Sequence, residues 1–306
     1  MSQRLVGRTS VTAKKMHDGE VTVDEPLVRQ LLRSQFPHLG DLPVHEVRST
    51  GTVNAIYRLG DDRCLRLPRI ERWAGDLAKE LEWLPKFAPR LPLAVPEPIA
   101  RGEPEHGYPF PWAIYRWIEG ETFTSDGIGD ERRAAVDLAE FVAALRRIDV
   151  AGGPRSGRRP LRELDTVTRA ALTASGDVID TPASMAAWEI ALQAPVWEGP
   201  AVWRHGDLLP PNLLVDDGRL RAVIDFGSMG IGDPASDIVA AWSLFDERGR
   251  DTFRDALDVD DATWARARGY ALHQALLIIP YYPETNPGFV AMARRTVQQV
   301  LADLPS

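Results

Sequence analysis

One segment of the chain combines three polar side chains with two apolar runs in an order that restricts its local fold. Asp207 is followed, after four intervening residues, by Asn212 and then by an apolar run. A turn sequence at 216–218 separates this run from a second apolar run, which ends directly before Asp225. The pattern predicts a loop, a strand, a hairpin turn and a second strand, so that the three polar side chains lie close together.

These three side chains supply what phosphoryl transfer from a nucleotide requires. A carboxylate such as Asp207 can orient an acceptor hydroxyl and accept its proton. Asn212 and Asp225 offer hard oxygen ligands for Mg²⁺, which bridges the phosphates of the nucleotide. An isolated Asp-Phe-Gly or Gly-Asp sequence is common at strand ends, but the joint order and spacing favour a functional site. His205 is expected to support the loop by hydrogen bonding.

Length and composition favour a globular protein of two lobes that share a cleft. The chain has 306 residues, of which 44% are hydrophobic, and no apolar run approaches the ~18 residues of a membrane span. The N-terminal residues lack the apolar core of a secretion signal. Cys64 is the only cysteine, which excludes an internal disulfide and favours a cytoplasmic location. With a formal net charge of −8, the chain is not expected to bind nucleic acid.

The pattern changes from strand-like to helical near residue 118. We assign 1–22 to a polar tail, 23–118 to an N-terminal nucleotide-binding lobe, and 119–306 to a C-terminal catalytic and substrate lobe. The predicted strands of the first lobe span 44–48, 55–59, 63–67 and 111–118. The predicted helices span 25–36, 76–84, 138–148, 234–245, 262–279 and 288–304, with Pro85 ending the second. The sequence therefore predicts an α+β fold with a small β-rich lobe and a larger, mostly helical lobe.

The order of residues in the polar segment resembles that of the aminoglycoside phosphotransferase family. The resemblance rests on His205-Gly206-Asp207 with Asn212, on Ile-Asp-Phe-Gly at 224–227, and on Gly-Ile-Gly-Asp-Pro-Ala-Ser-Asp at 230–237. It is strong over about 200–245 and looser from 44 to the C-terminus. It implies a two-lobed protein-kinase-like fold that phosphorylates hydroxyls of small molecules. It also implies Asp207 as catalytic base, with Asn212 and Asp225 as metal ligands.

The resemblance further implies nucleotide-binding residues in the N-terminal lobe. In the family, a lysine on the third strand binds the phosphates and pairs with a glutamate on the next helix, and Arg66 and Glu80 occupy these places. Leu65 and Leu67 alternate toward a core, so we expect Arg66 to face the cleft and to pair with Glu80. The other candidates are Ser49, Thr50, Gly51, Thr52 and Asn54 in the turn between two strands, and Trp117 and Ile118 at the hinge.

Acceptor contacts are predicted from acidic and aromatic residues that follow helical segments. Carboxylates beside the cleft would favour an amine-bearing acceptor, and tyrosines would stack on sugar or macrocycle rings. Asp233 and Asp237 flank a helix start, where carboxylates cap exposed N–H groups, so we interpret both as structural supports of the catalytic loop. The acceptor candidates are Asp246, Glu247, Tyr282 and Glu284.

The first hypothesis for function is Mg²⁺-dependent transfer of the γ-phosphate of ATP, or of GTP, to a hydroxyl of an aminoglycoside or another antibiotic. Fold and motif do not determine the acceptor, so a metabolite or natural product such as choline, a sugar or a macrolide is the alternative. A nucleotide-binding regulator without catalysis is a different class, which Arg66 in place of lysine keeps open. A metal hydrolase is disfavoured, because the remaining histidines lack ligand-like spacing.

Overall fold

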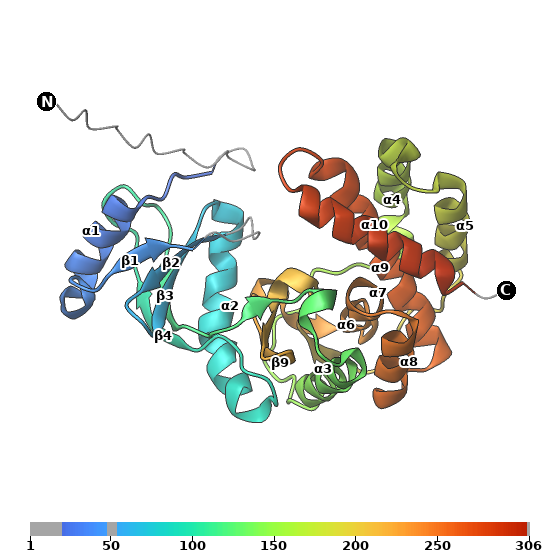
Figure 1. The fold of residues 1–306 in the computed structure, drawn as a ribbon, viewed down its shortest axis with the longest axis horizontal. Coiled ribbons are helices and arrows are strands. Elements are labelled where there is room, and N and C mark those ends of the chain that lie inside the picture. The colour runs from blue at the N-terminus through green and yellow to red at the C-terminus, as the bar shows by residue number, and fades with distance from the viewer. Residues whose placement is uncertain (1–19, 48–53, 305–306) are drawn as a thin grey trace, which may run out of the picture.

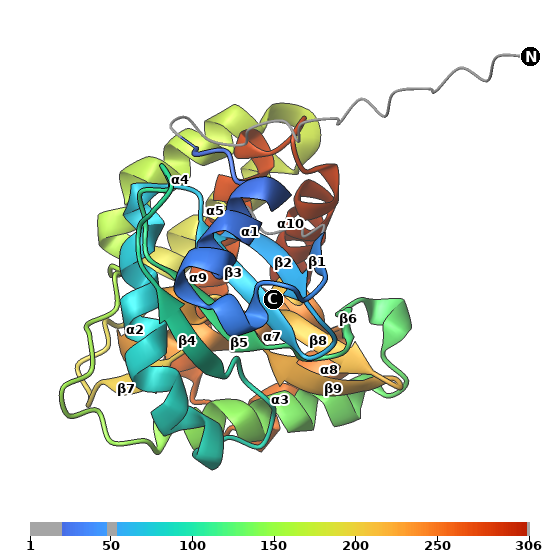
Figure 2. The same cartoon turned by 90° about the vertical axis from the view of Figure 1, so that its left-hand side faces the viewer.

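A five-stranded antiparallel sheet with the strand order β1-β2-β3-β5-β4 forms the centre of the N-terminal lobe. The computed structural model describes residues 20–47 and 54–304. Helices α1 and α2 lie on opposite sides of this sheet (Figure 1), and Figure 2 looks at it from the α1 side. The elements of this lobe are α1 (Glu25–Gln35), β1 (Val44–Glu46), β2 (Asn54–Leu59), β3 (Arg63–Pro68), α2 (Glu71–Phe87), β4 (Pro98–Gly102) and β5 (Trp112–Arg116).

Strand β3 presents alternate side chains to two hydrophobic cores, as its pattern predicts. Leu65 and Leu67 pack in one core with residues of α1 such as Leu31. Cys64 belongs to the core on the α2 side, and Arg66 reaches a side chain of α2 from the same face. The alternation of side chains along β3 thus gives the strand one buried apolar face and one face on which Arg66 points to the lobe interface.

The two helices of this lobe show where the sequence patterns succeed and fail. Helix α1 begins after Asp24, whose carboxylate accepts a hydrogen bond from the N–H of Leu27 (2.9 Å), and it ends one residue before the predicted end. Helix α2 is longer than predicted, and the expectation that Pro85 ends it is wrong. Leu84 and Phe87, on either side of this proline, are fully buried, and their packing offsets the lost backbone hydrogen bond.

The C-terminal lobe is mostly helical, with a two-stranded and a three-stranded sheet of short strands (Figure 1). The predicted strand–turn–strand segment is confirmed, because β8 and β9 pair antiparallel with Leu213 opposite Val223. Helix α4 was not predicted, because Thr168 and Ala171 occupy buried positions and weaken its apolar stripe. The helices are α3 (Glu131–Arg146), α4 (Leu161–Ser175), α5 (Thr181–Leu192), α6 (Ala235–Ile238), α7 (Ala240–Leu244), α8 (Glu247–Ala256), α9 (Asp261–Tyr281) and α10 (Pro287–Ala302). The strands are β6 (Glu121–Thr122), β7 (Val202–Arg204), β8 (Leu213–Asp216), β9 (Arg219–Val223) and β10 (Gly230–Gly232).

Aromatic side chains join helix α2 to the C-terminal lobe. The ring centre of Trp203, on β7, lies 4.5 Å from that of Trp83 and 4.9 Å from that of Phe87. Phe87 also packs 6.4 Å from Phe226, measured between ring centres. One hydrophobic core therefore continues across both lobes, and the lobe boundary at 118 stays a prediction from the sequence.

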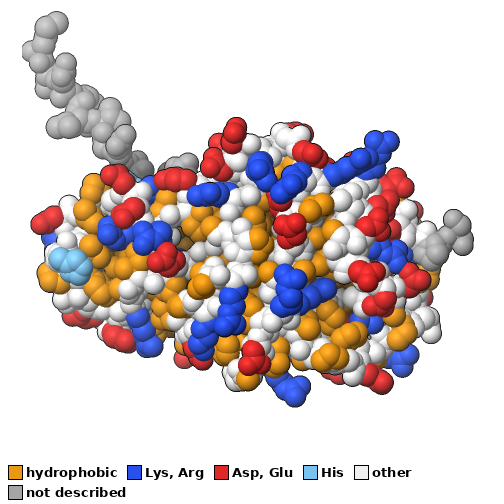
Figure 3. Space-filling view, turned by 90° about the horizontal axis from the view of Figure 1, so that it is seen from below, with side chains coloured by type: hydrophobic (Ala, Val, Ile, Leu, Met, Phe, Trp, Pro, Cys, Tyr) orange, Lys and Arg blue, Asp and Glu red, His pale blue; other side chains and the backbone are white. Residues whose placement is uncertain are grey.

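The surface carries charges of both signs. Acidic and basic side chains are interspersed on the face seen in Figure 3, with hydrophobic side chains between them. Within the ranges 20–47 and 54–304, none of the helices has the length and apolar character that crossing a bilayer requires.

The aromatic junction leads to a stability prediction for Trp203, which is fully buried. We expect Trp203→Ala to lower the free energy of unfolding by about 3–5 kcal/mol, because it leaves a cavity between the lobes. Val178 is 44% exposed, so Val178→Ala is the control and should change stability by no more than about 0.5 kcal/mol. Urea titration of both variants measures their free energies of unfolding. An equal decrease in the two variants would contradict a hydrophobic core shared by the lobes.

Candidate active site

The loop that carries Asp207 is held by a buried carboxylate from helix α6. Asp237 accepts hydrogen bonds from the backbone N–H groups of His205 (2.9 Å) and Gly206 (2.7 Å). Gly206 has a φ of +87°, and an added Cβ there would lie 2.5 Å from Nη1 of Arg204. Only glycine suits this position, and Asp237 fixes the backbone directly before Asp207.

Two amide side chains orient the carboxylate of Asp207. Asn212 donates from Nδ2 to Oδ2 of Asp207 (2.9 Å), and Gln274 donates from Nε2 to its Oδ1 (2.9 Å). Burial raises the pKa of Asp207, and the negative charge of Asp225 raises it further. A carboxylate with a raised pKa accepts a proton more readily than an exposed aspartate, a property that suits a general base.

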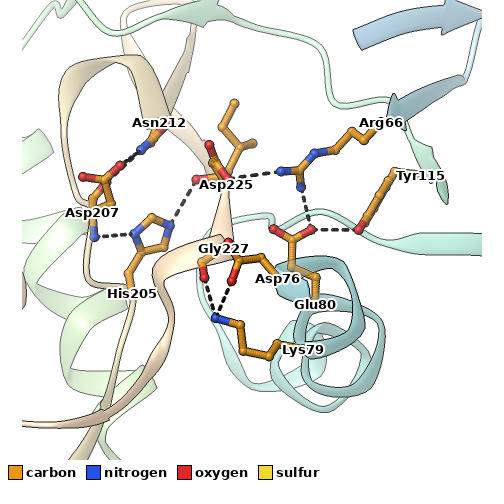
Figure 4. A network of polar contacts seen from close by, with 11 residues as sticks. Arg66, Asp76, Lys79, Glu80, Tyr115, His205, Asp207, Asn212, Asp225 and Gly227 are labelled. Carbon is orange, nitrogen blue, oxygen red and sulfur yellow. Dashed lines mark hydrogen bonds and ion pairs between the residues drawn. The ribbon is translucent and has the colours of Figure 1, made fainter. Parts of the chain in front are cut away.

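Asp225 lies after β9 in a left-handed backbone conformation, with a φ of 62° that aspartate tolerates better than most residues. His205 connects this position to the Asp207 loop (Figure 4). Its Nε2–H donates to the carbonyl of Ile224 (3.1 Å), and its Nδ1 accepts from the backbone N–H of Asp207 (3.2 Å). These two contacts hold the backbones of both aspartate positions at a defined separation.

Arg66 joins the two lobes through two carboxylates (Figure 4). Its Nη1 lies 2.6 Å from Oε2 of Glu80, and its Nη2 lies 3.1 Å from Oδ1 of Asp225, so the predicted pairing with Glu80 is present. The hydroxyl of Tyr115 donates to the same oxygen of Glu80 (2.7 Å). Burial lowers the pKa of Arg66, but the two carboxylates outweigh burial and hold it above its usual value, so the guanidinium is charged.

Three adjacent cavities follow the interface between the lobes. The first cavity, of about 410 Å³, is mostly apolar, and Trp117 and Ile118 line it. The second cavity, of about 90 Å³, shares Arg66 and Asp225 with the first. The third cavity, of about 530 Å³, shares Asp207 with the second. Asp225 thus stands where the first two cavities meet, and Asp207 where the last two meet.

The donor atoms of Asn212, which lines the first cavity, and of Asp225, which lines the first and the second, fit a cation that phosphates help to hold. No group of three or more His, Cys, Asp and Glu side chains in the described part of the chain is arranged to bind a metal by itself. Asn212 uses Nδ2 for Asp207, which leaves its Oδ1 for a cation, and one oxygen of Asp225 remains beside the one that contacts Arg66. Mg²⁺ characteristically takes one or two protein carboxylates or amides and completes its octahedron with phosphate and water.

Comparison with known proteins agrees with this geometry. Residues 45–270, more than half of the chain, match the family described as the phosphotransferase enzyme family. The chain belongs to this family. An aminoglycoside 3'-phosphotransferase of Streptomyces fradiae is 30% identical over 230 residues, which cover 69% of this chain and 82% of that protein. An aminoglycoside 3'-phosphotransferase of Niallia circulans is 27% identical over 191 residues, or 60% of this chain and 70% of that protein.

Solved phosphotransferase structures share the fold. The GDP and kanamycin complex of an APH(2") enzyme matches with a TM-score of 0.72 at 21% identity, over 90% of this chain and 98% of that chain. The macrolide 2'-phosphotransferase of Brachybacterium faecium matches with a TM-score of 0.58 at 23% identity, over 92% of this chain and 100% of that chain. The predicted kinase-like arrangement, with a small β-rich lobe and a larger helical lobe, is confirmed.

The structure does not bring every predicted site residue to this phosphotransferase cleft. Asn54 lines the first and second cavities. Asp233 pairs with Arg266 (2.9 Å) and accepts the N–H of Ala235, so it is placed at the helix start as predicted. The predicted phosphate-facing residues outside the described ranges are Ser49, Thr50, Gly51 and Thr52.

The predicted acceptor residues lie elsewhere. Asp246 caps helix α8, where its carboxylate accepts the N–H of Gly249 (2.8 Å). Tyr282 packs against Phe289, with 5.5 Å between ring centres. Local sequence does not tell which loops border a cleft, and these segments do not border the cavities that contain Asp207. The residues absent from the lining of both those cavities are Asp246, Glu247, Tyr282 and Glu284.

Other side chains at the cleft were not predicted. Lys79 donates to the carbonyl of Gly227 (2.7 Å) and pairs with Asp76 (2.8 Å), which ties α2 to the residues after Asp225. The spacing of Asp76 and Lys79 with Glu80 on one helical face was an available signal. No local pattern marks Gln274, because helix α9 reaches Asp207 only through the tertiary fold.

The buried ion pair of Arg66 leads to a second prediction. We expect Glu80→Gln to lower the free energy of unfolding by about 3–5 kcal/mol, because the buried guanidinium loses a charged partner. Glu97→Gln is the matched control, since the Glu97–Arg116 pair has the same charges at more than 50% exposure of each side chain, and it should leave stability close to that of the wild type. Thermal and urea unfolding of both variants test this, and equal effects would show that burial does not strengthen the Arg66 pair.

Proposed function

We propose that this phosphotransferase moves the γ-phosphoryl group of a nucleotide to a hydroxyl of a small molecule. The observation that carries the proposal is the position of Asp207, whose carboxylate borders both the second and the third cavity. A donor phosphate in the second cavity and an acceptor hydroxyl in the third would meet at this carboxylate. Phosphoryl transfer depends on such positioning and on charge stabilisation rather than on covalent catalysis by the protein.

In this proposal, Asp207 receives the proton of the acceptor hydroxyl. The amides of Asn212 and Gln274 hold its two oxygens, so the carboxylate is oriented before the acceptor binds. Its raised pKa makes it a competent proton acceptor, because burial and the charge of Asp225 both disfavour its ionised form. Asp237 and His205 act through the backbone and keep the loop in place.

Arg66 and the metal ligands act on the nucleotide side. Mg²⁺ held by Asn212 and Asp225 would neutralise charge that develops on the phosphates. Arg66 remains charged between Glu80 and Asp225 and presents a planar donor group to the second cavity. The backbone N–H and carbonyl of Ile118 form no hydrogen bond to other described residues, which leaves them for a purine edge in the first cavity, so ATP and GTP are both candidates.

The relatives suggest which acceptors to test first. Those named above are aminoglycoside and macrolide phosphotransferases, so we propose an antibiotic or a related natural product as the class of acceptor. We also propose a cytoplasmic location, where nucleotide is available and where the single, buried thiol of Cys64 stays reduced.

The proposed base is tested by Asp207→Asn, which keeps the size of the side chain. We expect the transfer rate to fall by about 10²–10⁴-fold, because the amide cannot accept the proton. Nucleotide affinity should stay near that of the wild type, since Asp207 lies beyond Asp225 as seen from the purine cavity. Single-turnover transfer and nucleotide titration separate the two effects, and unchanged transfer would exclude Asp207 as the base.

The donor and the metal are tested with labelled ATP and GTP against aminoglycosides, macrolides and small metabolites. We expect transfer that chelation of Mg²⁺ abolishes and added Mg²⁺ restores, because the cation would neutralise charge on the phosphates during transfer. Asp225→Asn should weaken Mg²⁺-dependent nucleotide binding. Tight nucleotide binding without transfer to any compound would instead support a regulator.

A further inference from the structure

Arg204 is a buried cation that has no hydrogen-bond or ion-pair partner among the residues that the structure describes. It is the last residue of β7, and only 3% of its surface is exposed. Its guanidinium forms no hydrogen bond or ion pair with any residue in 20–47 or 54–304, and Nε is completely shielded. Burial lowers the pKa of Arg204 to about 10; the negative charge of Asp237 opposes this decrease, and the positive charge of Arg158 adds to it. A buried, unpaired charge is costly, so this position requires another source of negative charge.

Arg158 lies on the same wall of the third cavity. Its Nη2 donates to the carbonyl of Gly206 (3.1 Å), and its guanidinium carbon lies 5.1 Å from the ring centre of Tyr270. Arg204 approaches the same glycine, since its Nη1 would lie 2.5 Å from a Cβ added there. Two guanidinium groups therefore flank the residue that directly precedes Asp207.

The lining of the third cavity has an excess of positive charge. Its two acidic side chains are Asp76, which pairs with Lys79 (2.8 Å), and Asp207, which accepts from two amides. Among the described residues, no carboxylate lies within ion-pair distance of the four arginines in this lining. The basic side chains are Lys79, Arg155, Arg158, Arg159 and Arg204.

The nearby carboxylates and the donor phosphates do not account for this charge. Asp237 and Asp233 attract Arg204 and Arg158 but lie beyond ion-pair distance of both. Asp237 is bound by two backbone N–H groups, and Asp233 pairs with Arg266. Arg66 supplies the cation of the second cavity, and neither Arg158 nor Arg204 lines that cavity. The unmatched charge therefore lies on the acceptor side of Asp207.

We infer that the third cavity binds an acceptor that carries an oxyanion, such as a carboxylate, held by Arg204 and Arg158. Guanidinium groups bind planar oxyanions through paired hydrogen bonds, and each such bond is strengthened by charge and by burial. The inference rests on the proposed function and narrows it, because a lining of this charge selects an anionic hydroxyl compound over a polycationic aminoglycoside. Arg204 and Arg158 are then residues that determine acceptor specificity.

Sulfate binding tests this site without requiring the true acceptor. The full-length protein is saturated with Mg²⁺ and a non-hydrolysable ATP analogue, which fills the first two cavities, and is titrated with sulfate or chloride at constant ionic strength. We expect saturable sulfate binding whose Kd rises about tenfold or more in Arg204→Gln and in Arg158→Gln. Arg254→Gln removes the same charge from helix α8, outside both cavities that contain Asp207, and should leave the Kd unchanged.

Several outcomes would overturn the inference. One is the absence of saturable sulfate binding, and another is a loss of sulfate affinity in Arg254→Gln equal to that in the two test variants. A third is displacement of sulfate by the nucleotide analogue, which would assign the arginines to the donor phosphates. Saturable kanamycin binding at concentrations where sulfate saturates would also overturn it. If the nucleotide analogue does not bind, the proposed function is wrong. Sulfate titration of the protein without the analogue then tests separately whether Arg204 and Arg158 bind an anion.

Discussion

The contact on which the cleft depends is the guanidinium of Arg66, whose side chain is 13% exposed, between two carboxylates. Glu80 on α2 and Asp225 after β9 come from different lobes, so this cation defines where strand β3 stands relative to the C-terminal lobe. A charge at this depth is stable only when its partners are retained, because the cost of desolvation is then offset by two ion pairs. These three side chains meet at the second cavity and form part of its lining.

The catalytic loop is held by a second set of contacts that acts mainly on the backbone. Gly206 and Asp225 both have positive φ values. Glycine adopts such values freely, whereas the conformation of Asp225 persists because surrounding contacts determine it. Asp237 binds the N–H groups before Asp207, and His205 connects the loop to Ile224. The aromatic junction packs α2, which carries Glu80, against β7, which directly precedes the Asp207 loop. Hydrophobic packing and polar contacts therefore position the same side chains.

Charge is distributed differently on the two sides of Asp207. On the proposed donor side, one arginine is matched by two carboxylates, and Mg²⁺ would offset part of the charge of the phosphates. On the acceptor side, Arg204 and its neighbours have no matching carboxylate among the described residues. Relatives that bear the same family signature are named for aminoglycosides, which are cations. Family membership therefore indicates the reaction, and we propose that the lining of the third cavity selects the acceptor.

The sequence by itself was enough to locate the proposed reaction centre, because its parts are local or periodic. Asp207, Asn212 and Asp225 are joined by one hairpin, and the alternation along β3 was enough to predict the contact of Arg66 with Glu80. Only the tertiary structure revealed the acceptor side. Arg158, Arg204 and Gln274 come from three distant segments, and whether an arginine is paired or unpaired depends on neighbours that no local pattern specifies. Burial and pairing are properties of the packed chain, and they turn ordinary basic residues into a candidate binding site.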